Sequence, residues 1–263
     1  MSKFDVKNKI DDWLYATYNT VADVLFFLKR DIRKVTAGNA RFIRKETGGR
    51  CFIVGTGPSL KSVPDELFNL MSKEYCFGVN FLYKSEVFNK VKPNYYVLMD
   101  DYFWGEYSNT FSEICNKYDI GKPVFITDYR AKDLLNDHHM FLHAKNYPVN
   151  NVRLDLCGNS SALMNVVSYS IAAAMFMGFK EIYLVGCDYN AFSTNGIGHC
   201  YDDDDLKESG LNLAYFLKFY HITTEFHYLL AKEAKKNGVK IINITDGSLL
   251  DAYPRVSYKK IDW

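Results

Sequence analysis

The feature that most constrains the fold is an alternation of short apolar runs with helix-like segments after residue 50. The runs are typical of buried strands and cover 51–55, 75–79, 95–99, 123–127, 181–186 and 239–244. Shorter segments with helical spacing lie between them, at 64–72, 84–91, 108–118 and 130–136. Such an alternation predicts an α/β, Rossmann-like fold with a mostly parallel sheet and helices on both faces.

Two longer helices are predicted in the second half of the chain. One is strongly apolar and covers 160–179, with Asn159 or Ser160 as its N-cap and Gly178 at its end. The segment 206–236 is expected to form one or two helices that end at Asn237-Gly238.

Residues 1–50 differ from the rest, so we expect an N-terminal helical extension (1–50) before a catalytic domain (51–263). Apolar residues recur at helical spacing from Ile10 to Leu28. The segment from Lys29 to Arg50 then holds eight basic residues against two acidic ones. Two interpretations stay open. The apolar stripe packs on the domain or on a second subunit of a homo-oligomer, or the helix lies on an anionic membrane surface.

Composition excludes several classes of protein. The chain is 48% hydrophobic and 24% charged, which is ordinary for a globular protein. A net charge of +1 argues against nucleic-acid binding. The six cysteines form no CxxC pair, and the charged start, MSKFDVKNKIDDW, lacks the apolar core of a secretory signal. No apolar run approaches the roughly 18 residues that span a bilayer. We expect a cytoplasmic protein, peripheral at the inner face of the membrane if the helix binds lipid.

The turn after the first predicted strand is rich in glycine. Parallel sheets bind ligands beyond the carboxyl ends of their strands, where the strand order reverses. Here that end reads GTGPSL (55–60), in which glycines allow close approach of the backbone and amides at a following helix favour an anion. The pattern is neither the GxGxxG dinucleotide fingerprint nor a Walker A loop.

Polar residues follow three other predicted strands. Asn80 comes after the second, the pair Asp100-Asp101 after the third, and Asp188 after 181–186. The asparagine could contact a base or ribose and the acidic pair a metal or a ribose hydroxyl, although each residue type also caps helices. Their shared position at the strand ends indicates a ligand site more strongly than any one of them.

A glycine-rich loop at 195–199 contains a histidine, His199. Histidine can act as a general base near neutral pH, and the alternative is a solvated loop side chain. Tyr201 and four aspartates, Asp202 to Asp205, follow. The aspartates are read as a solvated acidic turn rather than a cation site.

Together these segments resemble a known family. Val54 to Leu60, Asn80, the block from Ser160 to Asp188 and the Ile197-Gly198-His199 triplet are similar, in order and rough spacing, to bacterial sialyltransferases of glycosyltransferase family 42. The resemblance covers residues 51 to about 200, and GFKEIYLVGCD (178–188) is its most specific part. The GxGPSL start and the later G-x-x-x-I-x-L-x-G-x-D pattern also resemble a wider group that includes 6-hydroxymethylpterin diphosphokinase domains.

The sialyltransferase resemblance implies an inverting, metal-independent transferase with no cofactor. Its donor would be a CMP-activated sugar and its acceptor a hydroxyl of a surface glycan such as lipopolysaccharide or capsule. His199 would be the base. The implied donor contacts are Gly55, Thr56, Gly57 and Ser59 to phosphate and sugar, Asn80 to the nucleotide, Ser160 and Ser161 to the donor carboxylate, Asp188 to ribose or cytosine, and Tyr189 and Tyr201 to the leaving phosphate. Asp100 is also expected to contact the donor, because it follows a predicted strand.

Two alternatives remain. The wider group implies a pterin diphosphokinase-type enzyme that uses ATP and a metal. A Rossmann-like module could also bind a nucleotide without catalysis and serve the assembly of a glycan complex through its N-terminal helix. Each interpretation predicts a different ligand.

Overall fold

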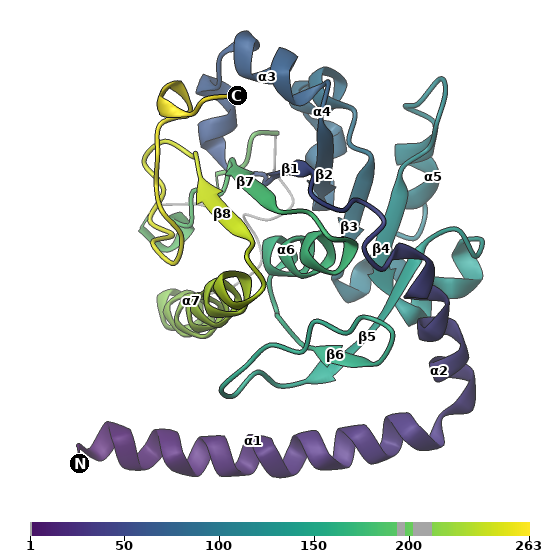
Figure 1. The fold of residues 1–263 in the computed structure, drawn as a ribbon, viewed down its shortest axis with the longest axis vertical. Helices are drawn as coiled ribbons and strands as arrows, with labels where there is room; N and C mark the ends of the chain where they lie inside the picture. The colour runs from purple at the N-terminus through teal and green to yellow at the C-terminus, as the bar shows by residue number, and fades with distance from the viewer. Residues whose placement is uncertain (1, 194–197, 202–211) are drawn as a thin grey trace.

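A computed structural model of the protein describes residues 2–193, 198–201 and 212–263. Its centre is an eight-stranded sheet with the order β6-β5-β4-β3-β2-β1-β7-β8, in which every neighbouring pair is parallel (Figure 1). The strands are β1 (Arg50–Val54), β2 (Tyr75–Val79), β3 (Tyr95–Leu98), β4 (Val124–Asp128), β5 (Met140–Asn146), β6 (Asn159–Ser161), β7 (Glu181–Val185) and β8 (Lys240–Asn243). The predicted α/β, Rossmann-like class is confirmed.

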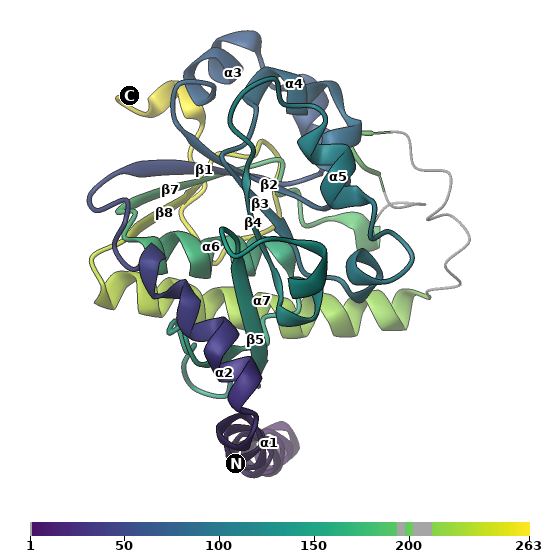
Figure 2. The ribbon, with the colours of Figure 1, turned by 90° about the vertical axis from the view of Figure 1, so that its right-hand side faces the viewer.

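Helices cover both faces of this sheet (Figures 1 and 2). The helices of the α/β body (residues 50–263) are α3 (Asp65–Met71), α4 (Glu86–Val91), α5 (Thr110–Cys115), α6 (Val166–Met177) and α7 (Leu213–Lys236). Successive side chains of a strand point to opposite faces, so Ile53 packs in one apolar cluster with α6 and α7, and Phe52 in a second cluster with α3, α4 and α5.

The six predicted strands are confirmed, but β5 and β6 were not predicted. The apolar run of β5 is interrupted by His143 and Lys145. Strand β6 has only three residues, Asn159–Ser161, and all three are polar. Neither segment therefore carries the continuous apolar signal of a buried parallel strand.

The helix predicted over 160–179 begins later than expected. Ser160 and Ser161 pair with β5 as part of β6, so α6 starts at Val166. Its N-cap is Asn165, whose side-chain oxygen accepts hydrogen bonds from the amides of Val167 and Ser168. The prediction of Asn159 or Ser160 as N-cap was wrong, whereas the predicted end at Gly178 is confirmed.

Two further helical predictions are refined. The segment 130–136 forms the 3₁₀ helix Tyr129–Leu134. Within the described part of 206–236 there is a single helix, α7, which ends at Lys236 before Asn237.

The N-terminal residues form α1 (Lys3–Leu28) and α2 (Arg30–Ala37). Helix α1 lies beside β5 and β6 at the edge of the molecule, and α2 leads from its end to the body (Figure 1). Ser2 and Asp5 form a capping box at the start of α1. Among the helices of the described residues, none is both long and apolar enough to cross a bilayer.

Candidate functional site

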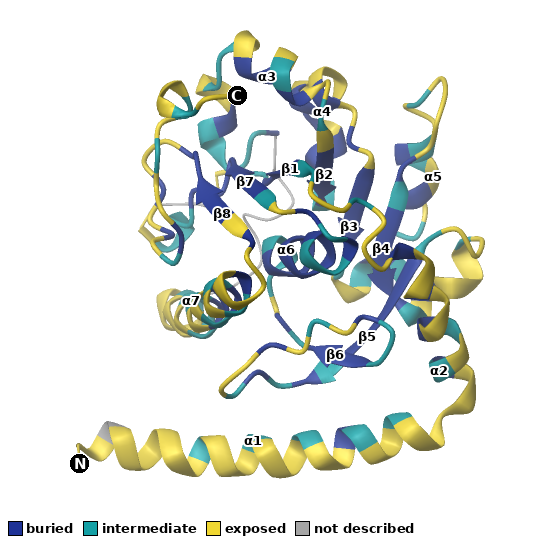
Figure 3. Cartoon of the chain, viewed as in Figure 1, coloured by how far each residue is buried: buried dark blue, intermediate teal, exposed yellow. Residues whose placement is uncertain are grey.

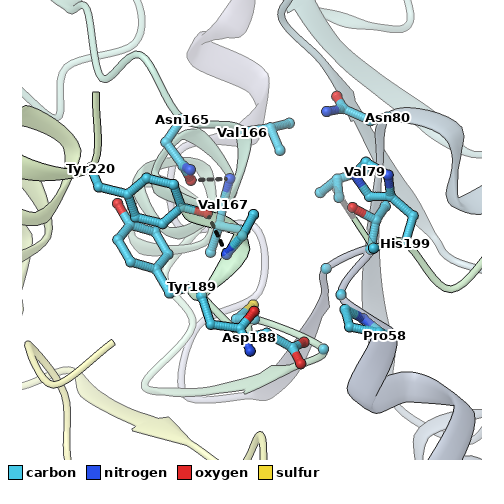
Figure 4. A pocket seen from close by; sticks show the side chains of 18 of the residues that line it. Pro58, Val79, Asn80, Asn165, Val166, Val167, Asp188, Tyr189, His199 and Tyr220 are labelled. Atoms are coloured by element: carbon cyan, nitrogen blue, oxygen red, sulfur yellow. Dashed lines mark hydrogen bonds between the residues drawn. The ribbon is translucent and has the colours of Figure 1, made fainter. Parts of the chain in front are cut away.

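A pocket lies at the carboxyl ends of β1, β2 and β7. Strand β1 pairs with β2 on one side and β7 on the other, so the strand order reverses there. Parallel sheets bind ligands at this point. The cavity encloses about 290 Å³. Its walls are the turns 55–58 and 186–191, residues 79–80, the start of α6, residues 198–199 and one side of α7 (Figure 4).

The floor is made by two turns that pack closely. The amide of Gly57 donates to the carbonyl oxygen of Gly186 at 2.9 Å, and that of Gly55 to Val185 at 2.8 Å. A Cβ atom on Gly57 would overlap the Asp188 carboxylate, and one on Gly55 would lie 2.9 Å from the carbonyl carbon of Gly186. Both glycines are therefore required for this backbone packing. Gly55, Thr56 and Gly57 line the pocket, and their contacts to a donor stay a prediction.

Asp188 connects the two turns. Its carboxylate accepts from the Ser59 hydroxyl at 2.7 Å and from the Ser59 amide at 3.2 Å. Asp188 is buried and lines the pocket, while Ser59 lies behind it, outside the lining. This contact positions the glycine turn, and a ribose or cytosine contact by Asp188 stays a prediction.

Three non-glycine residues of the lining have left-handed backbone conformations. Their φ angles are +44° at Asn80, +54° at Met164 and +58° at Tyr189. Such conformations cost about 1–3 kcal/mol each and cluster at ligand sites. The Asn80 conformation is fixed by the Tyr96 hydroxyl, which donates to its carbonyl oxygen at 2.9 Å.

The side chain of Asn80 carries an unsatisfied acceptor. Its Oδ1 atom is buried and has no hydrogen-bond partner within residues 2–193, 198–201 and 212–263. A buried acceptor without a partner costs about 1–3 kcal/mol. A donor group on a ligand would remove this cost, since Asn80 lines the pocket.

The start of α6 forms the wall opposite His199 (Figure 4). Asn165, Val166 and Val167 line the cavity there. Amides at a helix N-terminus favour an anion because they point outward and carry the positive end of the helix dipole. This wall was not predicted from the sequence, because the helix was expected to start six residues earlier, at Ser160. The available signal was Asn165 itself, an N-cap residue type before Val166.

His199 is held by its neighbours against the glycine turn. Its ring stacks on Tyr201 with centroids 4.9 Å apart and an interplanar angle of 4°. The amide of Cys200 donates to the carbonyl oxygen of Thr56 at 2.9 Å, and Gly198 lies against Pro58. The predicted base therefore lies in the pocket, while buried Tyr201 supports it from behind, outside the lining.

Tyr189 lines the pocket, but its hydroxyl group turns toward α7 and donates to Thr223. Burial raises its pKa well above the usual range. Sequence analysis missed three aromatic residues of α7 in the lining. These are Phe216, Phe219 and Tyr220. The hydroxyl of Tyr220 accepts from the amide of Ala191 at 3.2 Å. Tyr189, which was predicted to reach a phosphate, therefore has its hydroxyl bound to Thr223 instead.

Ser160 and Ser161 do not line the pocket. Both lie in β6 at the sheet edge, where Ser161 accepts from the amide of Arg153 at 2.9 Å. Their assignment to a donor carboxylate came from the sialyltransferase resemblance. Since both lie in β6 and outside the lining, the geometry gives this role no support.

Asp100 lines the pocket and accepts from the Tyr102 hydroxyl at 3.1 Å. Burial, more than the nearby charge of Asp101, raises its pKa.

The described residues hold no cluster of three or more His, Cys, Asp or Glu side chains that could bind a metal. The aspartates 202–205 and residues 195–197 lie outside the described residues.

Comparison with known families and with curated proteins found no match. Among solved structures, the Maf glycosyltransferase of Magnetospirillum magneticum AMB-1 is similar, with a TM-score of 0.49 and 14% sequence identity. The similarity covers 88% of this chain and 39% of that protein. A TM-score below 0.5 is too low to assign a function.

Proposed function

We propose that the protein is a glycosyltransferase, sialyltransferase-like, which transfers a sugar from a CMP-linked donor to a hydroxyl of a surface glycan. One observation carries the proposal. A histidine, His199, and the first residue of α6, Val166, whose amide is not capped by the Asn165 side chain, lie on opposite walls of one cavity at the strand-order reversal. A general base and an anion site therefore share a space between them.

In this mechanism His199 accepts the proton of the acceptor hydroxyl. The resulting oxygen nucleophile attacks the anomeric carbon, a new glycosidic bond forms, and the bond from that carbon to the donor phosphate breaks. CMP leaves with the bonding electrons, and the configuration at the anomeric carbon inverts. General-base catalysis of this kind contributes roughly 10²–10⁴-fold to the rate.

The donor would be held by groups already present in the pocket. The amides of Thr56 and Val166 would donate to the phosphate as its charge grows. The neighbouring Gly55 and Gly57 amides are already bound to backbone carbonyls, and the next two amides of α6 are capped by Asn165. The unsatisfied Oδ1 of Asn80 would accept from the amino group of cytosine. Asp100 would accept from a ribose hydroxyl.

The catalytic claim is tested with His199→Ala, assayed for transfer from CMP-linked sugars. We expect kcat to fall about 10²–10⁴-fold with little change in CMP affinity. The matched control is His221→Ala, an exposed histidine of α7 outside the pocket, which should keep full activity. Turnover by His199→Ala at the wild-type rate would contradict the assignment of the base.

The donor class is tested by calorimetry with CMP and with ATP plus magnesium. We expect CMP to bind more tightly and EDTA to have no effect. Asn80→Ala should weaken CMP binding, because the cytosine contact is lost. A magnesium-dependent preference for ATP would overturn the proposal in favour of a diphosphokinase. Tight CMP binding without turnover of any CMP-sugar would indicate a non-catalytic module.

A further inference from the structure

Helix α1 is attached to the body through a polar face. The Asn19 side chain donates to the carbonyl oxygen of Tyr147 at 2.8 Å and accepts from the same residue's amide at 2.7 Å. The ring of Tyr15 stacks on that of Tyr147, with centroids 3.6 Å apart. Asp23 pairs with Arg153 at 2.8 Å. These contacts fix the rotation of the helix about its axis.

That rotation turns the apolar face of α1 away from the body. Figure 3 shows the helix exposed along most of its length, with the less exposed residues on the side toward β5 and β6. Trp13 is 68% exposed and Leu28 69%. The apolar face, whose members are all at least 42% exposed, consists of Val6, Ile10, Trp13, Leu14, Val21, Val24, Leu25 and Leu28. Exposed apolar patches of this extent mark interaction sites.

The charges of α1 are segregated between its two sides. At 3.6 residues per turn, its four carboxylates fall on the half that faces the body. They are Asp5, Asp11, Asp12 and Asp23. The apolar face contains no acidic residue, whereas Lys3 and Lys7 lie on it. Lys9 and Asp11 lie at its two borders, and Asp11 is paired with Lys7 at 2.5 Å. At the other end come Lys29, Arg30 and Lys34, which are exposed and form no ion pair within the part of the chain that the structure describes.

This segregation distinguishes between two partners for the apolar face. Two copies of α1 packed face to face would bring their lysines together, and the nearest carboxylate, Asp11, is already paired with Lys7. An anionic phospholipid surface offers acyl chains to the apolar residues and negative headgroups to the bordering cations. Charge complementarity therefore favours the lipid surface.

We propose that α1 is an in-plane membrane anchor, which inserts its apolar face at the headgroup–acyl boundary of an anionic bilayer and holds the body on the aqueous side. Figure 1 shows the geometry that this requires, a straight helix along one edge of the molecule. Trp13 and Leu14 would enter the acyl boundary, and Lys29 and Arg30 would contact headgroups. The proposal is independent of the reaction that the pocket catalyses.

The test is flotation of the full chain with vesicles of phosphatidylcholine alone or mixed with phosphatidylglycerol. We expect strong binding only to the mixed vesicles, and weaker binding at high salt. The double variant Leu14→Gln/Leu25→Gln should bind at least tenfold more weakly. Both side chains are exposed, so folding is unaffected. The control is Ile120→Gln, which removes another exposed apolar side chain, 93% exposed and outside α1, and should bind like the wild type.

A second readout identifies the inserted residue. Brominated acyl chains quench a tryptophan only when it lies in the bilayer, so we expect quenching that disappears in Trp13→Phe. Binding unchanged by the double variant would overturn the proposal. Equal binding to both kinds of vesicle would also overturn it. A chain that binds no vesicles and forms a dimer, which the double variant dissociates, would overturn it as well.

Discussion

The pocket and helix α1 depart from ordinary protein architecture in opposite directions. At the pocket, polar atoms and left-handed residues lie inside, as at Asn80 and Tyr189. On α1, apolar side chains such as Trp13 and Leu28 lie outside. Each arrangement costs stability in the isolated chain, because a buried acceptor lacks a partner or an apolar surface meets water.

The two regions differ in how firmly the fold determines them. The pocket is built from backbone that cannot move without breaking the sheet, since its turns follow β1 and β7. Helix α1 is held by a few polar contacts at one edge. A ligand would therefore bind to a site that is already formed, whereas we expect α1 to detach without unfolding the body.

The largest effect is expected for Gly57→Ala. The new Cβ would overlap the Asp188 carboxylate and lie 2.7 Å from the carbonyl oxygen of Gly186, so two adjacent turns would have to separate. We expect a loss of about 4 kcal/mol in the free energy of unfolding, measured by urea denaturation. Gly38→Ala is the control, because its Cβ would contact nothing within 4 Å. Equal stability of the two variants would show that the floor of the pocket is adaptable.

Acid should weaken the body through its buried histidines. Burial lowers the pKa of His139 to about 4 and that of His227 to about 3, against 6.5 unperturbed. Between pH 6.5 and about 4 the unfolded chain binds protons that the folded chain does not, so stability falls as the pH falls. We expect a loss of about 2 kcal/mol or more between pH 7.5 and pH 5.

Urea denaturation at several pH values measures this slope. His227→Gln should reduce it, and His221→Gln, which alters an exposed histidine of the same helix, should leave it unchanged. Residues 1–50 contain no histidine, so the effect belongs to the body. A stability independent of pH in this range would contradict the prediction.

A gain in stability is expected for Asp100→Asn. Burial raises the pKa of Asp100 in the folded protein above its value of 3.8 in the unfolded chain, so its ionisation at neutral pH opposes folding. Asp100 is partly open to solvent, which screens this penalty, so the variant should melt only slightly higher and bind CMP more weakly. Below pH 3.8 the gain should vanish, because the carboxyl group is then protonated in both states. Asp101→Asn, at a neighbour outside the pocket lining, should leave CMP binding unchanged. Unaltered melting at neutral pH would show that Asp100 is not penalised by burial.

Much of the body could be predicted from sequence because its strands are continuous apolar runs. Burial on both faces imposes this pattern on β1, β2, β3, β4, β7 and β8. At the β6 edge of the sheet the pattern is absent, so β6, with its three polar residues, gave no signal. The error passed to the next element, since Ser160 was interpreted as the start of α6 when it belongs to β6.

The pocket residues that could be predicted from the sequence are those that directly follow a strand. Gly55, Gly57 and Asp188 follow strands directly, and the strand ends meet at one edge of the sheet. Tyr220 could not be found this way. It lies on α7, and only tertiary packing brings that helix over the pocket. Likewise, helical spacing identified the apolar stripe of α1, but its outward direction depends on Asn19 and Tyr147, far apart in sequence.

The smallest effect on global stability is expected for Asn19→Ala, which removes both hydrogen bonds to the Tyr147 backbone. If α1 is attached locally, the body should unfold at the same urea concentration, within about 0.5 kcal/mol. Hydrogen exchange in α1 should nevertheless become roughly tenfold faster, which corresponds to about 1.4 kcal/mol of local opening.

The matched control for this change is Thr20→Ala, whose hydroxyl donates only to Ala16 within the helix. It should alter neither the unfolding midpoint nor the exchange rates. If Asn19→Ala lowered the global unfolding free energy by as much as it speeds local exchange, α1 and the body would be one cooperative unit. The anchor would then be a rigid extension of the body, so a force on the bilayer-bound helix would reach β5 and β6 directly. A purely local effect would instead leave the body free to tilt on its anchor without strain at the pocket.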